Sequence, residues 1–278
     1  AIERKNDNIG MPYFVWGVSY NKLNKYDENI SIGGTNPTSS LTDWFASRAN
    51  GINYTNLSNK DPYYSHLAWE TYLIDPADAS GSRYVTAYDK YGENQSHRIS
   101  KVGGHSEYNV AIAFNFIHKV FVGFDLGFQT VNYKQTIVTS EDRPGVTSGV
   151  KSFEFTDVVR TTGSGVNFKA GILYSPIEKI RFGASIQTPT SLKLKDRYST
   201  SCVTNMIDST MSCESPEGAY EYNVLTPFRA NASFCYIPVE NFSFNIDYDL
   251  ASYKSIKMRS SDYDFAQETQ NIIDNYGV

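Results

Sequence analysis

The sequence predicts an all-β fold, an antiparallel transmembrane β-barrel of the outer-membrane type. The first observation is a strict alternation of apolar with small or polar residues, seen at residues 120–128 and again at 242–250. One face of such a strand suits lipid and the other suits water. The second is the aromatic content, with 21 Tyr and 16 Phe, which suits the aromatic girdles at the two membrane interfaces. The third is that short and very long connections alternate along the chain.

Composition narrows the class further. The mean hydropathy of -0.41 does not contradict a barrel, because a barrel strand exposes only every second residue to lipid. No run reaches the roughly 18 apolar residues that mark a spanning helix. The net charge of -5, without a basic stripe, argues against nucleic-acid binding. We find no signal peptide, and because the chain starts at Ala1 we expect an upstream segment to have been removed or left out.

Seven segments have the strand pattern, and each has one apolar face that we expect to contact membrane lipid. They cover residues 12–24, 97–117, 119–136, 164–176, 179–198, 219–237 and 240–258. The opposite faces are mostly small or polar, and we expect them to face a lumen. Their polar members are Asn115, Asp125, Asn167, Lys169, Arg181, Gln187, Arg229, Asn231, Asn245, Asp247 and Asp249.

The connections predict the orientation of the strands. Residues 117–119, 176–179 and 238–241 form short turns, whereas residues 25–96, 137–163 and 199–218 form long loops. Short periplasmic turns and long extracellular loops are typical of barrels in the bacterial outer membrane. A soluble sandwich has no reason to segregate its loop lengths in this way.

Seven strands are an odd number for a closed barrel. Bacterial single-chain barrels have even strand numbers, because an open edge in hydrocarbon leaves backbone groups unpaired. We therefore expect residues 1–278 to form one β-barrel domain that is incomplete.

The long extracellular loop at residues 25–96 contains two predicted short helices. Ser40 begins a capping-box-like sequence before the first, and Asp61-Pro62 begins the second, which runs to Leu73. Residues 262–276 are a third amphipathic stretch. The aromatic side chains of the loop have two interpretations: they pack the helices onto the barrel rim, or they line an entry groove for an apolar ligand. These candidates are Trp44, Phe45, Tyr63, Tyr64, Trp69 and Tyr72.

Cys202 and Cys213 flank a polar, loop-like segment, so that they either form a disulfide or remain two free thiols. We expect no enzyme, no cofactor and no metal site, because the catalytic and phosphate-binding motifs are absent. Asp247 and Asp249 share a strand face and are interpreted as solvated lumen charges. The scattered histidines are interpreted as ordinary polar residues: His66, His97, His105 and His118.

Four segments together carry a family resemblance. They are residues 163–176, with the sequence GSGVNFKAGILYSP, residues 180–190, with IRFGASIQTPT, residues 16–24, with WGVSYNKLN, and residues 226–229, with TPFR. These segments resemble the Bacteroidetes branch of the FadL/TodX family of outer-membrane transport proteins. Members of this branch are often labelled hemin receptor or aromatic hydrocarbon degradation membrane protein. The resemblance covers most strands between residues 12 and 258 and does not extend to the loops.

The resemblance implies a fourteen-stranded outer-membrane barrel for passive uptake of hydrophobic small molecules, such as long-chain fatty acids or aromatic hydrocarbons. The family's N-terminal hatch and its final strands have no counterpart here, so that residues on the hatch cannot be carried over. A lateral exit through the wall needs an interrupted strand, and residues 103–104 and 188–190 are candidates. An alternative function is that of a subunit in a larger outer-membrane secretion or assembly complex, with protein partners.

Overall fold

The computed structural model describes residues 2–3, 13–88, 90–116 and 119–276. No helix within these ranges is long and apolar enough to cross a membrane. The elements in chain order are β1 (Ile2–Glu3), β2 (Tyr13–Lys25), β3 (Glu28–Asn36), α1 (Leu41–Ala49), η1 (Tyr54–Asn56), α2 (Leu57–Lys60), α3 (Ser65–Glu70), β4 (Ile74–Pro76), β5 (Tyr84–Thr86), β6 (Glu93–Phe116), β7 (Val120–Asp142), β8 (Val150–Ile177), β9 (Ile180–Gln187), β10 (Ser191–Met206), β11 (Thr210–Glu214), β12 (Gly218–Leu225), β13 (Phe228–Val239), β14 (Phe242–Ser252), η2 (Tyr253–Ser255), β15 (Lys257–Arg259) and α4 (Ala266–Tyr276).

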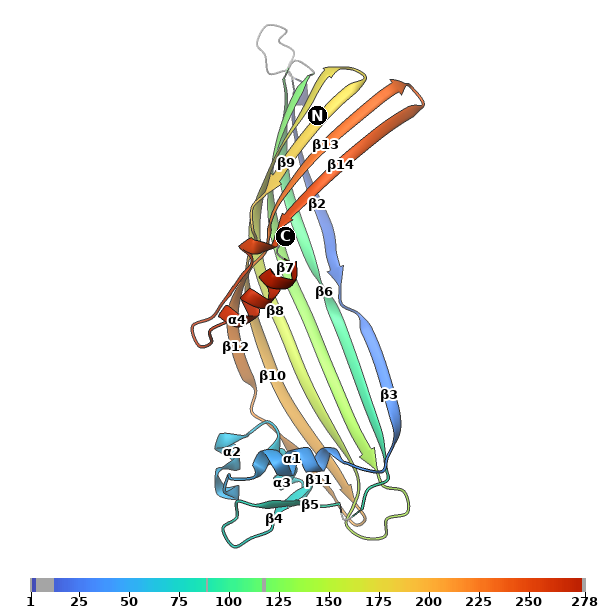
Figure 1. Cartoon of the computed structure of the whole chain (residues 1–278), viewed down its shortest axis with the longest axis vertical. Helices are drawn as coiled ribbons and strands as arrows, with labels where there is room; N and C mark the ends of the chain where they lie inside the picture. The colour runs from blue at the N-terminus through green and yellow to red at the C-terminus, as the bar shows by residue number, and fades with distance from the viewer. Residues whose placement is uncertain (1, 4–12, 89, 117–118, 277–278) are drawn as a thin grey trace.

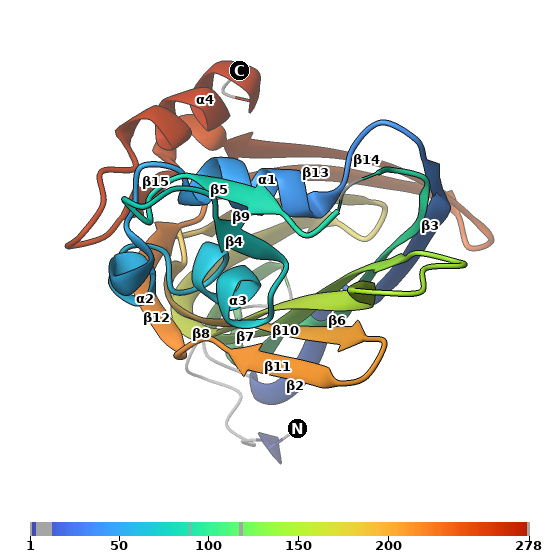
Figure 2. The ribbon, with the colours of Figure 1, turned by 90° about the horizontal axis from the view of Figure 1, so that it is seen from below.

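One large antiparallel sheet dominates the molecule, and it curls along its length (Figures 1 and 2). Its main path runs β1-β2-β6-β7-β8-β10-β12-β15, with β3 beside β6. At the end with the short turns, β9, β13 and β14 continue the sheet beyond β8. Within the described residues β14 pairs only with β13, and no strand joins β14 to β2. The described sheet is therefore open.

The convex face carries the apolar stripe of every strand. One row of directly opposed residues crosses seven strands: Phe14, Phe114, Val122, Ile172, Ala184, Ala232 and Tyr248. The side chains of this face are exposed, and Trp16 and Val18 reach 64% and 66%. The strand alternation predicted from the sequence thus forms a continuous surface, because the register brings the apolar stripes of neighbouring strands onto the same face.

The concave face carries the other set of residues. Asp125, Lys169, Gln187 and Arg229 are directly opposed on four consecutive strands. All eleven residues predicted to share the polar face lie on it: Asn115, Asp125, Asn167, Lys169, Arg181, Gln187, Arg229, Asn231, Asn245, Asp247 and Asp249.

The strands extend far beyond the apolar stripe, and here the predicted loop boundaries were wrong. β3 pairs with β6, so that the connection predicted at residues 25–96 is only residues 37–92. The loops predicted at 137–163 and 199–218 are mostly paired strand as well. These extensions were not predicted because they are rich in Thr, Ser and Val and have no apolar stripe. Of the predicted short turns, that at 117–119 falls partly on residues 117 and 118, outside the described ranges.

Two of the predicted strands are each divided in two. The strand expected at 179–198 stops after Gln187 and resumes at Ser191, and that at 219–237 stops after Leu225 and resumes at Phe228. Each gap contains a proline, which cannot donate to the ladder. The side chains of Thr188 and Thr226 replace part of the missing bonding, since their hydroxyls accept from the amides of Phe168 and Thr190. After β14 the chain also leaves the ladder, at residues 253–256.

The segment 37–92 folds into a helical subdomain that lies against the concave face at the far end of the sheet (Figures 1 and 2). Ser40 caps α1 in a full capping box with Asp43, as predicted. The second helix is shorter than predicted, because it begins at Ser65 and ends where Tyr72 takes a positive φ of 60°. The subdomain contains three α-helices and the β4–β5 pair rather than two helices. Its buried core joins the sheet through Phe45, Leu57, Leu67, Leu73, Phe153, Phe155 and Cys202.

Candidate functional site

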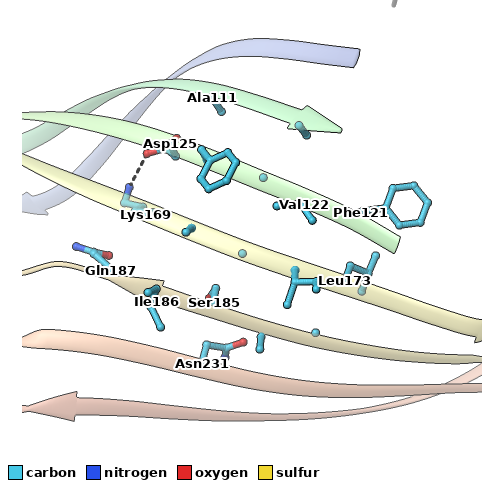
Figure 3. Close-up of a pocket in the computed structure, with 18 of the residues that line it drawn as sticks. Ala111, Phe121, Val122, Asp125, Lys169, Leu173, Ser185, Ile186, Gln187 and Asn231 are labelled. Carbon is cyan, nitrogen blue, oxygen red and sulfur yellow. Dashed lines mark ion pairs between the residues drawn. The ribbon is translucent and has the colours of Figure 1, made fainter. Parts of the chain in front are cut away.

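A hollow of about 650 Å³ lies on the concave face where β6, β7, β8, β9 and β13 meet (Figure 3). Small residues form its floor: Gly123 opposes Gly171, and Gly171 opposes Ser185. Phe121 and Leu173 oppose each other on β7 and β8 toward the short-turn end. The hollow exists because adjacent strands place small side chains on the same face at the same level.

A buried polar cluster lies next to this hollow, farther from the short turns. Its centre is Glu107, which is 3% exposed. The Glu107 carboxylate accepts from Lys169 Nζ at 2.6 Å, from Asn167 Nδ2 at 2.8 Å and from Gln129 Nε2 at 2.9 Å. Lys169 also donates to Asn109 Oδ1 at 2.8 Å and lies 3.4 Å from Asp125 Oδ1 (Figure 3). One lysine therefore holds two carboxylates on neighbouring strands.

Gly127 is the residue that makes room for this cluster. It lies between Asn109 and Asn167 in the register. A Cβ atom at Gly127 would lie 2.5 Å from Asn167 Oδ1, 2.6 Å from Glu107 Oε1 and 3.1 Å from Asn109 Oδ1. The side chains of the two neighbouring strands thus lean over the glycine, and any side chain there would displace them.

The cluster reaches the strand interruptions through Asn167. Its Nδ2 also donates to Thr190 Oγ1 at 3.0 Å. Thr190 lies in the gap between β9 and β10, and its carbonyl accepts from the amide of Thr226 at 3.0 Å, next to the gap between β12 and β13. A chain of hydrogen bonds thus connects the Glu107–Lys169 ion pair to both gaps.

Two further hollows follow on the concave side toward the helical subdomain. The middle one, about 750 Å³, is lined by Tyr26, Tyr133, Leu194 and Tyr222, among others. The outer one, about 690 Å³, lies between β3, β6 and α1 and is lined by residues including Ile32 and Trp44. Along β6, His97 lines the outer hollow, Lys101 the middle one and Ala111 the inner one. The three hollows therefore follow one another along the concave face.

The aromatic candidates of the loop separate into two groups. Phe45 is fully buried and packs on Phe155 at 5.1 Å between ring centroids, so its assignment to a ligand groove was wrong. Trp44 is 44% exposed and lines the outer hollow. Tyr63, Tyr64 and Trp69 are half-buried and Tyr72 is exposed.

Arg48 fixes the aromatic wall of the subdomain. Its guanidinium carbon lies 5.4 Å from the Trp44 ring centroid and 4.9 Å from that of Tyr64. Its Nε lies 2.7 Å from Asp61 Oδ2. The Tyr64 hydroxyl donates to Asp157 Oδ2 at 3.4 Å, and burial raises the pKa of both Tyr64 and Asp157. These contacts attach the subdomain to β8.

Cys202 and Cys213 are directly opposed on β10 and β11, and both are free thiols, the second of the two alternatives that the sequence left open. Thr71 Oγ1 donates to Cys202 Sγ at 3.3 Å, so the sulfur of this buried thiol has a hydrogen-bond partner within the core. In the described chain no group of three or more His, Cys, Asp or Glu side chains is arranged to hold a metal ion. His118 lies outside the described residues.

Sequence reasoning missed Glu107, Asn109 and Gln129, the acceptors and donors at the centre of the cluster. The signal was present, since 107 and 109 have the same parity as the polar position 115 on the same strand, and 129 the same parity as 125. They were not predicted because the apolar face of the segment at 97–117 begins only at Tyr108, so that the residues before it show no clear alternation.

The fold and the site define a class: a curled antiparallel sheet with an exposed apolar convex face and a hollowed, partly polar concave face. Comparison with protein-family models, with curated proteins and with solved structures finds no match to this chain.

Proposed function

We propose that this chain forms part of the wall of a bacterial outer-membrane barrel through which hydrophobic small molecules cross passively, as members of the FadL/TodX family do. The observation that carries the proposal is the convex apolar surface, in which one row of directly opposed residues crosses seven strands. In water such a surface would be far larger than the apolar patches that soluble proteins expose.

The height of the apolar surface fits a bilayer. On β6, β7 and β8 the stripe runs over residues 108–116, 120–128 and 166–174. Each stretch covers about nine residues, close to the 9–11 that a tilted strand needs to cross the hydrocarbon core. Further strands would join β2 to β14, because an open edge in lipid leaves N–H and C=O groups without partners.

The concave hollows supply the ligand path. An apolar molecule would first contact Trp44 and Ile32, then the tyrosines of the middle hollow, and then the small-residue floor at Gly123 and Gly171. Apolar walls with a few polar groups are typical of small-molecule sites. The Glu107–Lys169 cluster carries two carboxylates for one ammonium group, and this excess of negative charge favours uncharged ligands near the cluster. Arg229, which also lines the inner hollow, has no ion-pair partner among the described residues.

A blocked hollow tests the function. Gly171→Leu would fill the inner hollow, because a Cβ at Gly171 meets only ordinary contacts at 3.4 Å and beyond. We expect it to reduce the entry of a neutral hydrophobic fluorophore into liposomes that contain the purified protein. The matched control is Gly17→Leu, on the same face but outside the hollow, with nothing within 4 Å of its Cβ. Equal entry with both variants would contradict transport through this hollow.

A native-membrane pull-down separates transport from the subunit alternative. Recovery of a stoichiometric protein partner, together with fluorophore entry unaffected by Gly171→Leu, would favour a role in a larger outer-membrane complex. Recovery of the protein alone, with entry blocked by the substitution, would favour transport.

A further inference from the structure

Glu93 is a buried carboxylate on the concave face at the start of β6, outside the proposed transport path. It is 1% exposed. Gln95, two residues along the same face, directly opposes Glu141 of β7. Glu93 and Glu141 are therefore diagonal neighbours, a relation in which the Cα atoms lie about 7–8 Å apart. Both side chains lie beneath the helical subdomain.

The two carboxylates differ in how they are satisfied. Glu141, also 1% exposed, accepts from Ser40 Oγ at 2.6 Å, from the Leu41 amide at 2.7 Å and from Gln95 Nε2 at 2.8 Å. It thereby anchors the start of α1. Neither oxygen of Glu93 accepts a hydrogen bond from any described residue. A charged group buried in this way is strongly unfavourable unless something compensates for it.

A third buried oxygen in the same region also lacks a partner. The Tyr88 hydroxyl has no hydrogen bond within the described chain. Its ring packs 6.3 Å from that of Phe153, the residue on β8 that opposes Glu141. Arg143 lies on the other side of the Tyr88 ring, with its guanidinium carbon 4.4 Å from the ring centroid. Burial and the charges of Glu141 and Glu93 raise the pKa of Tyr88, and burial raises that of Glu141.

We propose that Glu93 and Glu141 bind a calcium ion at the junction between the helical subdomain and the sheet. Ca²⁺ is a hard cation that takes oxygen ligands in flexible geometry, including bidentate carboxylates and water. Glu93 offers two free oxygens, and Glu141 adds a second negative charge. The ion would connect β6 to the carboxylate that caps α1, so that the subdomain would be fastened to the sheet by metal as well as by packing. The site does not depend on the transport function.

Thermal unfolding of the purified chain in detergent, with and without added Ca²⁺, tests the site. We expect Ca²⁺ to raise the melting temperature of the wild type in a saturable manner. Glu93→Gln should weaken Ca²⁺ binding by about tenfold or more, since ligand charge sets the affinity of such sites. The control is Glu154→Gln, which removes an exposed carboxylate of β8 that pairs with Arg98 and should leave the calcium response unchanged.

Terbium luminescence gives a second readout that does not rely on stability. Tb³⁺ occupies calcium sites and is sensitised by nearby phenols, so wild-type protein should give an emission that Ca²⁺ displaces and that Tyr88→Phe lowers. Absence of both the thermal shift and the emission would overturn the proposal. A Glu93→Gln variant that is more stable than the wild type, with no calcium response in either, would overturn it too, because it would show that the buried carboxyl group costs stability without binding an ion.

Discussion

Replacement of Gly127 by alanine tests whether the Glu107 cluster stabilises the sheet. The added Cβ would lie 2.5 Å from Asn167 Oδ1 and 2.6 Å from Glu107 Oε1, so both side chains must move. Glu107 Oε1 accepts two hydrogen bonds, from Asn167 and Gln129, that this movement would break or lengthen. Hydrogen bonds to a charged group contribute about 1.5–3 kcal/mol each, and partial loss of two would cost about 3–4 kcal/mol.

The backbone effect of the substitution has the opposite sign. Alanine is favoured over glycine within a strand by about 0.5–1 kcal/mol, which leaves a net loss of about 2–3 kcal/mol in the free energy of unfolding. Gly17→Ala provides the reference, because nothing lies within 4 Å of its Cβ, and it should stabilise the protein by about 0.4–1 kcal/mol.

The assay is urea unfolding of the protein in detergent micelles, followed by tryptophan fluorescence, for the wild type and both variants. If Gly127→Ala and Gly17→Ala unfold at the same urea concentration, the crowding at Gly127 is not a constraint and the reasoning is refuted. A loss confined to Gly127→Ala supports it.

Three further predictions concern other regions. Phe45→Ala should destabilise the helical subdomain by about 3–5 kcal/mol, because a buried ring leaves a cavity; faster proteolysis between residues 37 and 92 than in Trp44→Ala would show this. Arg229 lines the inner hollow and has no ion-pair partner among the described residues, so its guanidinium group can contact the carboxylate of a fatty acid. Arg229→Ala should therefore weaken binding of a fatty acid but not of its methyl ester, and equal loss for both would contradict a carboxylate contact. Burial raises the pKa of the Cys202 thiol to about 11, above its usual 9.0, so stability from the neutral thiol is complete below pH 9 and is lost as the pH rises toward 11. Cys202→Ala should reduce the alkaline destabilisation by about 3 kcal/mol in unfolding titrations, since one pKa unit corresponds to about 1.4 kcal/mol; an unchanged profile would contradict the shift.

The apolar face and its strands could be read from the sequence, because the two-residue period is local and each apolar position is large. The short turns leave few alternative registers, so the pairing of neighbouring strands follows from the turns. The eleven polar residues fell on one face for the same reason: parity along each strand decides the face.

The strand ends and the polar cluster could not be read in the same way. Beyond the apolar stripe, as in the stretch that contains Thr136 and Val138, apolar and polar residues no longer alternate strictly, and the pattern carries no signal. The partners of Glu107 come from positions 60 and 62 residues away on β8, which only the register brings together. The burial of Phe45 likewise depends on Phe155, a residue in a segment that had been predicted as loop.

The strand interruptions give the sheet a stiff side and a compliant side. β6, β7 and β8 keep one unbroken ladder from the short turns to the helical subdomain, without a register shift between β6 and β7 or between β7 and β8. The neighbouring strands are interrupted at residues 188–190, 226–227 and 253–256. Motion of β9, β13 and β14 would therefore pivot at these interruptions, and their amides should exchange with solvent deuterium sooner than those of β7, because local opening there disrupts fewer cooperative bonds.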